Sequence, residues 1–165
     1  MGKIDGVVVG IVKSLPDNLG RIEVYFPWLS DNNKSYRARV ATLMAGPNRG
    51  SWFMPELEDE VLVAFEQDDV NHPYIIGFLW NGQDKPPKTD PKIRLIRSVN
   101  GHEIEIYDPG VSGGDKGHIR VKDAHGNIIE LANGRIDITG VSFIGINAPQ
   151  VVINGRPVAV APGPI

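Results

Sequence analysis

Four carboxylates close together are the first candidates for chemistry in this sequence. Several oxygen ligands in one place are what a hard cation such as Ca²⁺ collects. Consecutive residues of a strand point to opposite faces, however, so neighbouring carboxylates at a strand start cannot all converge on one ion. We therefore interpret them as solvated turn charges before a strand. They are Glu56, Glu58, Asp59 and Glu60.

A second candidate group, Asp68, Asp69 and His72, has the residue types of acid–base catalysis. The surrounding residues 67–73 consist mainly of turn formers and predict a hairpin loop. The sequence therefore predicts no catalytic residue at this place, and we expect no enzyme activity.

Trp28, Trp52 and Trp80 form the third candidate group, because aromatic rings stack on bases in proteins that bind single-stranded nucleic acid. Such proteins also need cations for the phosphates. Trp52 and Trp80 adjoin acidic or apolar residues instead, so we expect them to pack between protomers. Single-stranded nucleic-acid binding remains the alternative function.

Composition narrows the class of protein further. The 17 basic and 20 acidic residues give a net charge of −3, which offers no broad surface for nucleic acid. The notable basic cluster of the first half is Arg37, Arg39 and Arg49, and we expect it to contact acidic loops of a neighbouring subunit or hub. The absence of cysteine excludes disulfides and thiolate chemistry. No secretory signal pattern opens the chain, so we expect synthesis in the cytoplasm.

The first half predicts a β-barrel. Apolar stretches bounded by Gly, Pro, Asn or Asp predict five strands, and no helical period is present. Five such strands, with an insertion at 44–57, fit a small Greek-key barrel of the OB type over residues 1–82. Residues 83–92 contain three prolines and otherwise only polar or charged residues, and predict an exposed linker. The predicted strands are 7–13, 21–26, 36–43, 60–66 and 74–79.

After residue 98 the pattern changes to short alternating strands, each built on two aliphatic residues two positions apart. One chain of this kind cannot build a closed core, because each strand offers a single apolar face. We therefore expect an intertwined trimeric β-helix at 93–165, whose strand edges pair with neighbouring chains. Polar positions such as Glu105 and Arg120 would face water. The predicted trimer core is Ile104, Ile106, Ile119, Val121, Ile129, Leu131, Ile136, Ile138, Ile144 and Ile146.

Three histidines in this second half could line the axis of a trimer and hold a metal ion or an anion. They are His102, His118 and His125. Histidines more often cap surface turns, and His125 directly precedes the turn signal at 126–127. We therefore predict no metal site and no cofactor, and leave an axial ion as an open alternative. A polysaccharide-active β-helix enzyme would need a carboxylate pair facing one groove, and residues 93–165 suggest none.

Several runs of this sequence resemble one known family. WFMPELEDEVLVAF at 52–65, the Asp pair at 68–69 and HPYIIGFLWN at 72–81 resemble the OB domain of phage baseplate spike proteins and type VI secretion VgrG proteins. SVNGHEI at 98–104 and DAHGN at 123–127 resemble the entry into the triple-stranded β-helix of that family. Nearly the whole chain therefore resembles the family of phage baseplate assembly protein V and VgrG-like tail spikes.

The resemblance implies a structural function without catalysis. It implies a homotrimeric spike beneath the tail tube of a bacteriophage or related contractile injection system, with the OB domain docked on the baseplate hub. Sheath contraction would drive the β-helix through the target outer membrane. No His-X-His pair occurs near the C-terminus, so the iron tip of some members is not expected. A separate PAAR-type tip protein and a cap made by residues 157–165 are the two alternatives for the tip.

Overall fold

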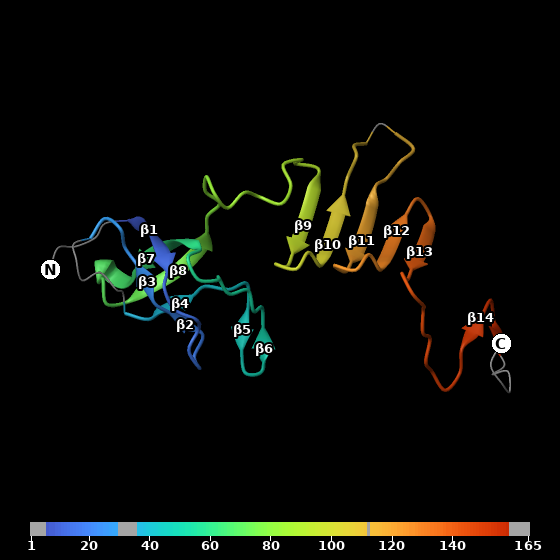
Figure 1. Ribbon diagram of the computed structural model, residues 1–165, viewed down its shortest axis with the longest axis horizontal. Coiled ribbons are helices and arrows are strands. Elements are labelled where there is room, and N and C mark those ends of the chain that lie inside the picture. The colour runs from blue at the N-terminus through green and yellow to red at the C-terminus, as the bar shows by residue number, and fades with distance from the viewer. Residues whose placement is uncertain (1–5, 30–35, 112, 159–165) are drawn as a thin grey trace. The chain divides into compact units, whose positions relative to one another are not determined.

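The computed structural model describes residues 6–29, 36–111 and 113–158. The chain divides into two compact units, Met1–Pro86 and Pro87–Ile165, and each is described by itself. Both units are built from strands (Figure 1). Within the described ranges the one helical element is the short 3₁₀ turn Glu66–Asp68, and no helix there is long and apolar enough to cross a membrane.

The first unit is a nearly closed β-barrel, as the sequence predicted for an OB domain. Its six-stranded sheet has the order β2-β4-β8-β7-β1-β3, in which only β4 and β8 are parallel neighbours. Because β2 and β3 are consecutive in the chain yet stand at opposite ends of this order, the sheet curls almost into a cylinder. Its strands are β1 (Val7–Val12), β2 (Arg21–Ile22), β3 (Val24–Tyr25), β4 (Ala38–Val40), β7 (Glu60–Phe65) and β8 (Pro73–Phe78).

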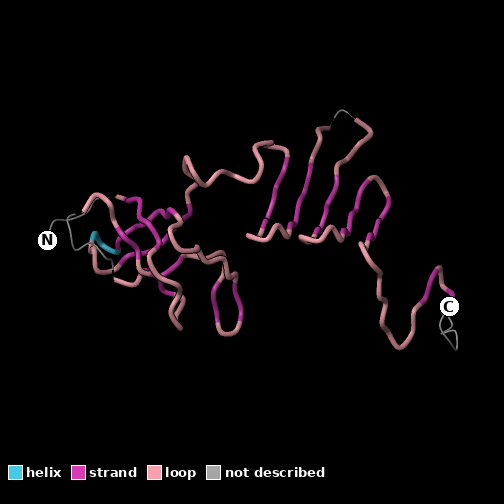
Figure 2. The backbone as a smooth tube through the Cα atoms, in the orientation of Figure 1, coloured by secondary structure: helices cyan, strands magenta, loops and turns pink. Residues whose placement is uncertain are grey.

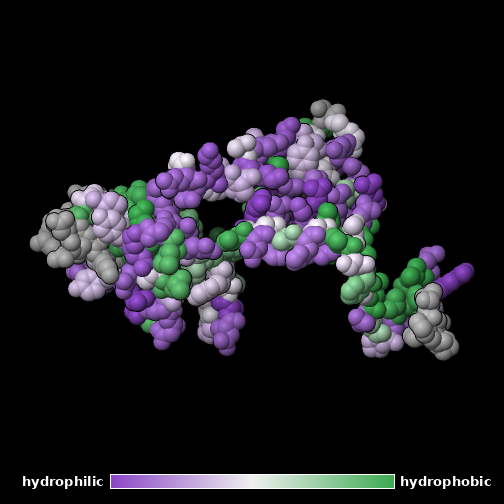
Figure 3. Space-filling view, in the orientation of Figure 1, coloured by the Kyte–Doolittle hydropathy of each residue, from purple (hydrophilic) through white to green (hydrophobic). Residues whose placement is uncertain are grey.

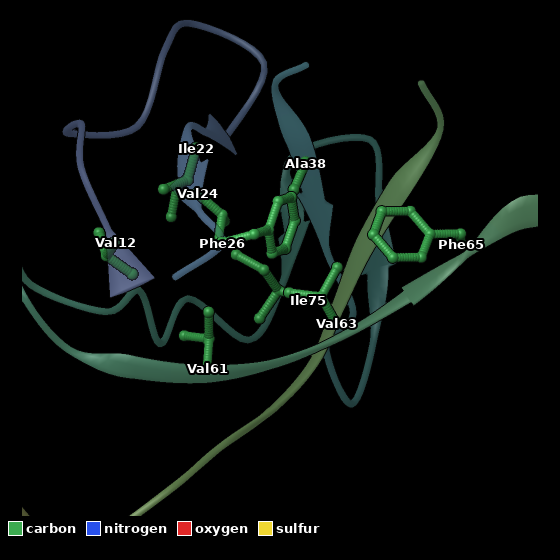
Figure 4. Packing of buried hydrophobic residues seen from close by; sticks show 9 residues of the cluster. All are labelled: Val12, Ile22, Val24, Phe26, Ala38, Val61, Val63, Phe65 and Ile75. Atoms are coloured by element: carbon green, nitrogen blue, oxygen red, sulfur yellow. The ribbon is translucent and has the colours of Figure 1, made fainter. Parts of the chain in front are cut away.

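Alternation along the strands places one side of each inside the barrel. In β7 the odd positions Val61, Val63 and Phe65 are buried, while the even positions are half-buried on the outer face. Each fully buried side chain of this size stabilises the fold by roughly 1.5–3 kcal/mol relative to exposure. Figure 4 shows the nine core side chains, which come from the six strands of the sheet and the segment after β3. They are Val12, Ile22, Val24, Phe26, Ala38, Val61, Val63, Phe65 and Ile75.

The barrel differs from the sequence prediction at three places. The second predicted strand is divided at Glu23, whose backbone N–H donates to the Ser14 hydroxyl at 2.9 Å. The third is shorter than predicted and is confined to β4. The insertion at 44–57 contains an unpredicted hairpin, β5 (Ala45–Gly46) with β6 (Arg49–Gly50). Its turn holds Asn48 in the left-handed region (φ 53°), which asparagine tolerates better than most residues.

The second unit is a five-stranded antiparallel meander, drawn in Figure 2 as neighbouring strands joined at alternating ends. Its order β13-β12-β11-β10-β9 follows the chain directly. A two-stranded hairpin, β14 (Val152–Ile153) with β15 (Arg156–Pro157), follows later. The strands of the meander are β9 (Ile93–Arg97), β10 (Glu103–Tyr107), β11 (His118–Lys122), β12 (Ile128–Ala132) and β13 (Arg135–Thr139).

The meander also differs from the prediction. Strand β9 was not predicted, and neither Ile144 nor Ile146 belongs to a strand. All five strands pair with their sequence neighbours in the same chain, whereas the prediction placed these hydrogen bonds between chains. Closely spaced strands joined by tight turns find their partners locally, so the intertwined pairing expected from residue 93 is wrong for residues 93–139. The cap predicted at 157–165 falls mostly on 159–165, which lie outside the described residues.

Hydrogen bonds and an ion pair hold the predicted linker at both ends. On the barrel side, Oδ1 of Asn81 accepts hydrogen bonds from the N–H groups of Gln83 and Asp84 at 2.8 and 2.7 Å. On the meander side, Nζ of Lys88 lies 3.5 Å from Oε2 of Glu105, and Nζ of Lys92 donates to a loop carbonyl at 2.9 Å. Residues 85–87 alone separate these anchors.

Candidate assembly surfaces

One face of the meander carries two continuous rows of aliphatic side chains. Directly opposite residues of antiparallel neighbours point to the same face, so the register identifies each row. The first row runs through Ile96, Ile104, Val121, Ile129 and Ile138. The second row runs through Ile106, Ile119, Leu131 and Ile136.

These rows are not covered by the chain itself. The ten residues predicted for the trimer core have 41–68% of their surface exposed, although hydrophobic residues of this size are normally buried. Hydrophobic side chains also make up much of the visible surface of the segment after β13 in Figure 3. A contiguous exposed apolar face of this kind marks an interaction surface. That the ten predicted residues form the core of a trimer stays a prediction.

Strand β9 extends the apolar face beyond the predicted residues. Ile96 lies opposite Ile104 and continues the first row, but Arg94 lies opposite Ile106 and ends the second. The Arg94 guanidinium pairs with the Asp108 carboxylate at 3.0 Å. This strand was not predicted because arginines interrupt its aliphatic residues directly after the Pro-rich linker. The first row is therefore one strand longer than the second.

The opposite face of the meander is a ladder of charges. Arg97 pairs with Glu103 at 2.9 Å, and Arg120 pairs with Glu130 at 2.6 Å. Glu105 lies at the centre of this face and is only 5% exposed, so the prediction that it faces water is wrong. Its carboxylate contacts three cationic or hydrogen-bonding groups, which exclude water from it while replacing water's hydrogen bonds. They are Lys88, His118 and Arg120.

The charge ladder shifts the pKa of two of its carboxyl groups. The hydrogen bond from His118 holds the pKa of Glu105 below its ordinary value, and the nearby charges of Lys88 and Arg120 act in the same direction. The hydrogen bond from Arg120 likewise lowers the pKa of Glu130. Both carboxylates are therefore ionised at neutral pH, and this face is a network of ion pairs.

Side chains also tie successive turns to one another along the edges of the sheet. Nδ1 of His102 accepts a hydrogen bond from the N–H of Ala124 at 3.3 Å, which joins the first turn of the meander to the third. Oδ1 of Asn127 accepts from the N–H of Val141 at 2.8 Å. At the other edge, Nδ2 of Asn133 donates to Asp115 at 3.0 Å. These bonds fix the position of each turn relative to the next.

The three predicted histidines have separate positions in the single chain. His102 joins two turns, His118 is bonded to Glu105, and His125 is exposed in the turn before Gly126. Nowhere in the described ranges do three or more His, Cys, Asp or Glu side chains gather closely enough to hold a metal ion. An axial ion bound by several chains stays a hypothesis.

The two groups of acidic residues in the barrel, at 56–60 and 68–72, take part in turns. Asp59 closes a turn, since its carboxylate accepts the N–H of Glu56 at 2.8 Å, and Glu58 pairs with Lys13 at 2.6 Å. In the 66–72 loop, His72 lies 3.0 Å from Asp69, whose pKa is lowered chiefly by the N–H of Asn71. The structure thus holds these residues in turns, as the sequence predicted, except that Glu60 is the first residue of β7.

The three tryptophans occupy different parts of the barrel unit. The ring of Trp28 contacts the core residue Phe26, with ring centroids 5.7 Å apart, and its N–H donates to the carbonyl of Val9 at 3.3 Å. Trp52 and Trp80 are each 68% exposed and are free to contact another protein. Their packing between protomers stays a prediction.

Trp52 lies in a cleft beside the β5–β6 hairpin, together with two of the three clustered arginines. The cleft has a volume of about 510 Å³ and is lined by Arg39 and Arg49 among others. Arg39 lies over the Tyr74 ring at 5.5 Å from its centroid. The third arginine, Arg37, pairs instead with Glu23 at 3.4 Å.

Comparison with known proteins gives a family for the barrel. Residues 4–80 match the "type VI secretion system/phage-baseplate injector OB domain". This range includes all six strands of the barrel sheet and ends before the linker.

Several characterised spike proteins are similar to the chain over a longer range. It is 36% identical over 129 residues to the type VI secretion system spike protein VgrG1a of Pseudomonas aeruginosa, which is 69% of this chain and 20% of that protein. It is 32% identical over 98 residues to the spike protein VgrG3 of Vibrio cholerae, covering 56% of this chain and 10% of the relative. A similar match of 34% is to the actin cross-linking toxin VgrG1 of Vibrio cholerae, over 9% of that protein. The chain therefore spans only a small part of these relatives.

Proposed function

Since its barrel belongs to the injector OB domain family of type VI secretion systems and phage baseplates, and the chain is VgrG-like, we propose that it is a central spike subunit of a contractile injection system. In this proposal three copies assemble at the baseplate hub of a phage tail or related particle. The barrel, residues 1–82, docks on the hub or tail tube, and residues 93–165 form the rod that crosses the target outer membrane. The function is mechanical, with no catalytic step.

The observation that carries the proposal is the uncovered pair of aliphatic rows. A monomer that exposed both rows would leave a flat apolar sheet in water. Three meanders with their apolar faces turned to one axis would bury these rows against each other, while the charge ladders faced outward. This arrangement needs no strand exchange within residues 93–139, because each sheet is already complete in its own chain.

Stiffness would follow from such a trimer. No strand could leave its sheet without exposing the aliphatic rows of all three chains, so local opening would be costly. A rod of this kind suits a part that must transmit force without bending. The same proposal covers the end of the rod. That end is either blunt and bound by a separate PAAR-type tip protein, or capped by the chain itself.

The experiment is the solution mass of the full chain, measured by light scattering, with a gel that compares boiled and unboiled samples in SDS. We expect a trimer that runs as a trimer unless it is boiled. A monomer at all concentrations would overturn the proposal and would direct attention to single-stranded nucleic-acid binding, which retention on single-stranded DNA with salt dependence would detect.

A further inference from the structure

The cleft beside the β5–β6 hairpin combines two positive charges with exposed apolar walls. Met44 is 54% exposed and Trp52 is 68% exposed on its rim. Arg49 forms no ion pair with any residue in the described part of the chain, and neither does Arg39, whose guanidinium lies over the Tyr74 ring, although the chain as a whole is acidic. A cleft of this chemistry fits a carboxylate that is flanked by an aliphatic side chain.

Arg49 is held in position for such a contact. A Cβ atom at Gly46 would lie 2.8 Å from Cζ of Arg49, so the guanidinium lies directly over a residue without a side chain. The base of the hairpin is closed by two hydrogen bonds, from the N–H of Ser51 to the carbonyl of Met44 at 3.0 Å and from the Thr42 hydroxyl to the carbonyl of Ser51 at 2.8 Å. A preorganised arginine loses less conformational freedom when it binds.

The same barrel exposes a turn with the complementary chemistry. Residues 56–58 read Glu-Leu-Glu, and Leu57 is 52% exposed between the two carboxylates. The carboxylate of Glu56 has no ion-pair partner within the described residues, whereas that of Glu58 is shared with Lys13. Backbone hydrogen bonds fix the turn, because the N–H of Glu58 donates to Val12 at 3.0 Å.

The turn is therefore held against β1 and does not fill the cleft of its own barrel. We propose that the Glu56-Leu57-Glu58 turn of one barrel docks in the Arg39–Arg49 cleft of a second copy of this chain. Leu57 contacts the apolar wall at Trp52, and Glu56 pairs with Arg49. Because the turn and the cleft are different surfaces of the barrel, the contact is head-to-tail, and three barrels can close into a ring through it.

This inference rests on the proposed trimer, which brings the barrels together. Residues 85–87, between the two anchored parts of the linker, can span at most about 14 Å. Three barrels tethered so closely meet at millimolar effective concentration, so even a weak contact between them is populated. Single-stranded nucleic acid is the less suitable occupant, since two cations neutralise few phosphates.

Cysteine cross-linking tests the contact in the full chain, which has no cysteine of its own. One variant carries Leu57→Cys, and the other carries Ala45→Cys, on the cleft wall. The two chains, with different tags, are co-expressed, treated with a bifunctional maleimide and boiled in SDS. We expect covalent products that contain both tags, and little product from either variant expressed alone. Adding Arg49→Glu to the Ala45→Cys chain should reduce the cross-linked product several-fold.

Lys85→Glu is the matched control, since it changes the charge equally at a linker residue outside the cleft, and it should leave cross-linking unchanged. Circular dichroism melting checks that each variant is folded. A trimer by light scattering that gives no mixed product, or one whose product is insensitive to Arg49→Glu, overturns this inference and leaves the proposed spike intact. A monomer overturns both. Retention of the wild-type chain on single-stranded DNA that Arg49→Glu abolishes would assign the cleft to nucleic acid instead.

Discussion

Glu105 accepts a hydrogen bond from Nε2 of His118 at 3.0 Å, although the residue directly opposite Glu105 in the sheet is Arg120. The histidine reaches diagonally across the ladder, and its ring also lies against Tyr107 with centroids 5.4 Å apart. Lys88 approaches the same carboxylate from the linker at 3.5 Å. One acidic side chain therefore joins two strands and the linker.

Acid should weaken the meander through this carboxylate. The pKa of Glu105 is below its ordinary value of 4.5 in the folded chain, so its stabilising effect is complete above pH 4.5 and is lost as the pH falls through the folded-state pKa. Glu105→Gln should lower the melting temperature at neutral pH and flatten its fall below pH 4.5. Thermal unfolding followed by circular dichroism at stepped pH measures both. Asp137→Asn, at an exposed residue of the same sheet, is the control and should keep the wild-type slope.

A charge on the apolar face should prevent assembly. Ile138→Asp, in the first row of this face, or Ile146→Asp, at a predicted core residue after β13, would place three carboxylates on the axis of the proposed trimer, and each buried unpaired charge costs several kcal/mol. Light scattering should then give the mass of a monomer. Thr139→Asp, whose side chain lies on the charged face, should assemble normally. A soluble, SDS-resistant trimer from either isoleucine variant would contradict the proposed axis.

Two adjacent isoleucines of β8 should differ in their effect on barrel stability. Ile75 is fully buried, so Ile75→Ala should destabilise the barrel by about 2–5 kcal/mol through lost packing and an unfilled cavity. Ile76 is 45% exposed, and Ile76→Ala should change stability by less than about 1 kcal/mol. Chemical denaturation measures the difference. Equal losses would mean that the outer wall of the barrel is covered in solution.

Gly117 should not tolerate a side chain. Its φ is +79°, and an added Cβ would lie 1.8 Å from the carbonyl oxygen of Tyr107, so Gly117→Ala must move the loop before β11. We expect a loss of at least about 2 kcal/mol. Gly114→Ala in the same loop meets no atom within 4 Å and should be nearly neutral. Melting curves of the two variants, measured side by side, test this pair.

Removing the turn-to-turn hydrogen bonds of one asparagine should have a local effect. Asn127→Ala deletes the acceptor for the N–H of Val141, so that amide should exchange faster with solvent. Asn133→Ala deletes both the acceptor for the N–H of Lys116 and the donor to Asp115 at the other edge, and should speed exchange there instead. Hydrogen exchange resolved by residue distinguishes the two. If both variants sped exchange throughout the meander, these bonds would not act separately.

Two kinds of pattern in the sequence predicted strands that the structure has. Apolar stretches between turn formers predicted β1, β7 and β8, alternation predicted the aliphatic pairs of β10–β13, and the register confirms that the pairs at 104–138 share one face. The β5–β6 hairpin escaped because Ala45 and Gly46 carry no apolar alternation. The cleft that the hairpin helps to line was consequently missed, and only its arginines and Trp52 had been singled out.

Burial of Glu105 could not be expected from its position in the strand. Alternation assigns Glu105 to the polar face of the strand, and the polar face of such a strand is normally exposed to water. Three groups from other parts of the chain cover it, and one of them is a lysine of the linker. Pairing within the chain was missed for a related reason: a repeated strand pattern allows local and intermolecular partners equally, and the turns decide between them.

The meander grows by addition of identical elements. Every strand from β10 to β13 contributes two aliphatic residues to the same two rows and returns by its own turn. Duplication of one hairpin would therefore lengthen the sheet by about 10 Å, two strand spacings, without changing the cross-section of its apolar face. Such a sheet can evolve in reach through tandem duplication, and relatives with rods of different lengths can share one cross-section.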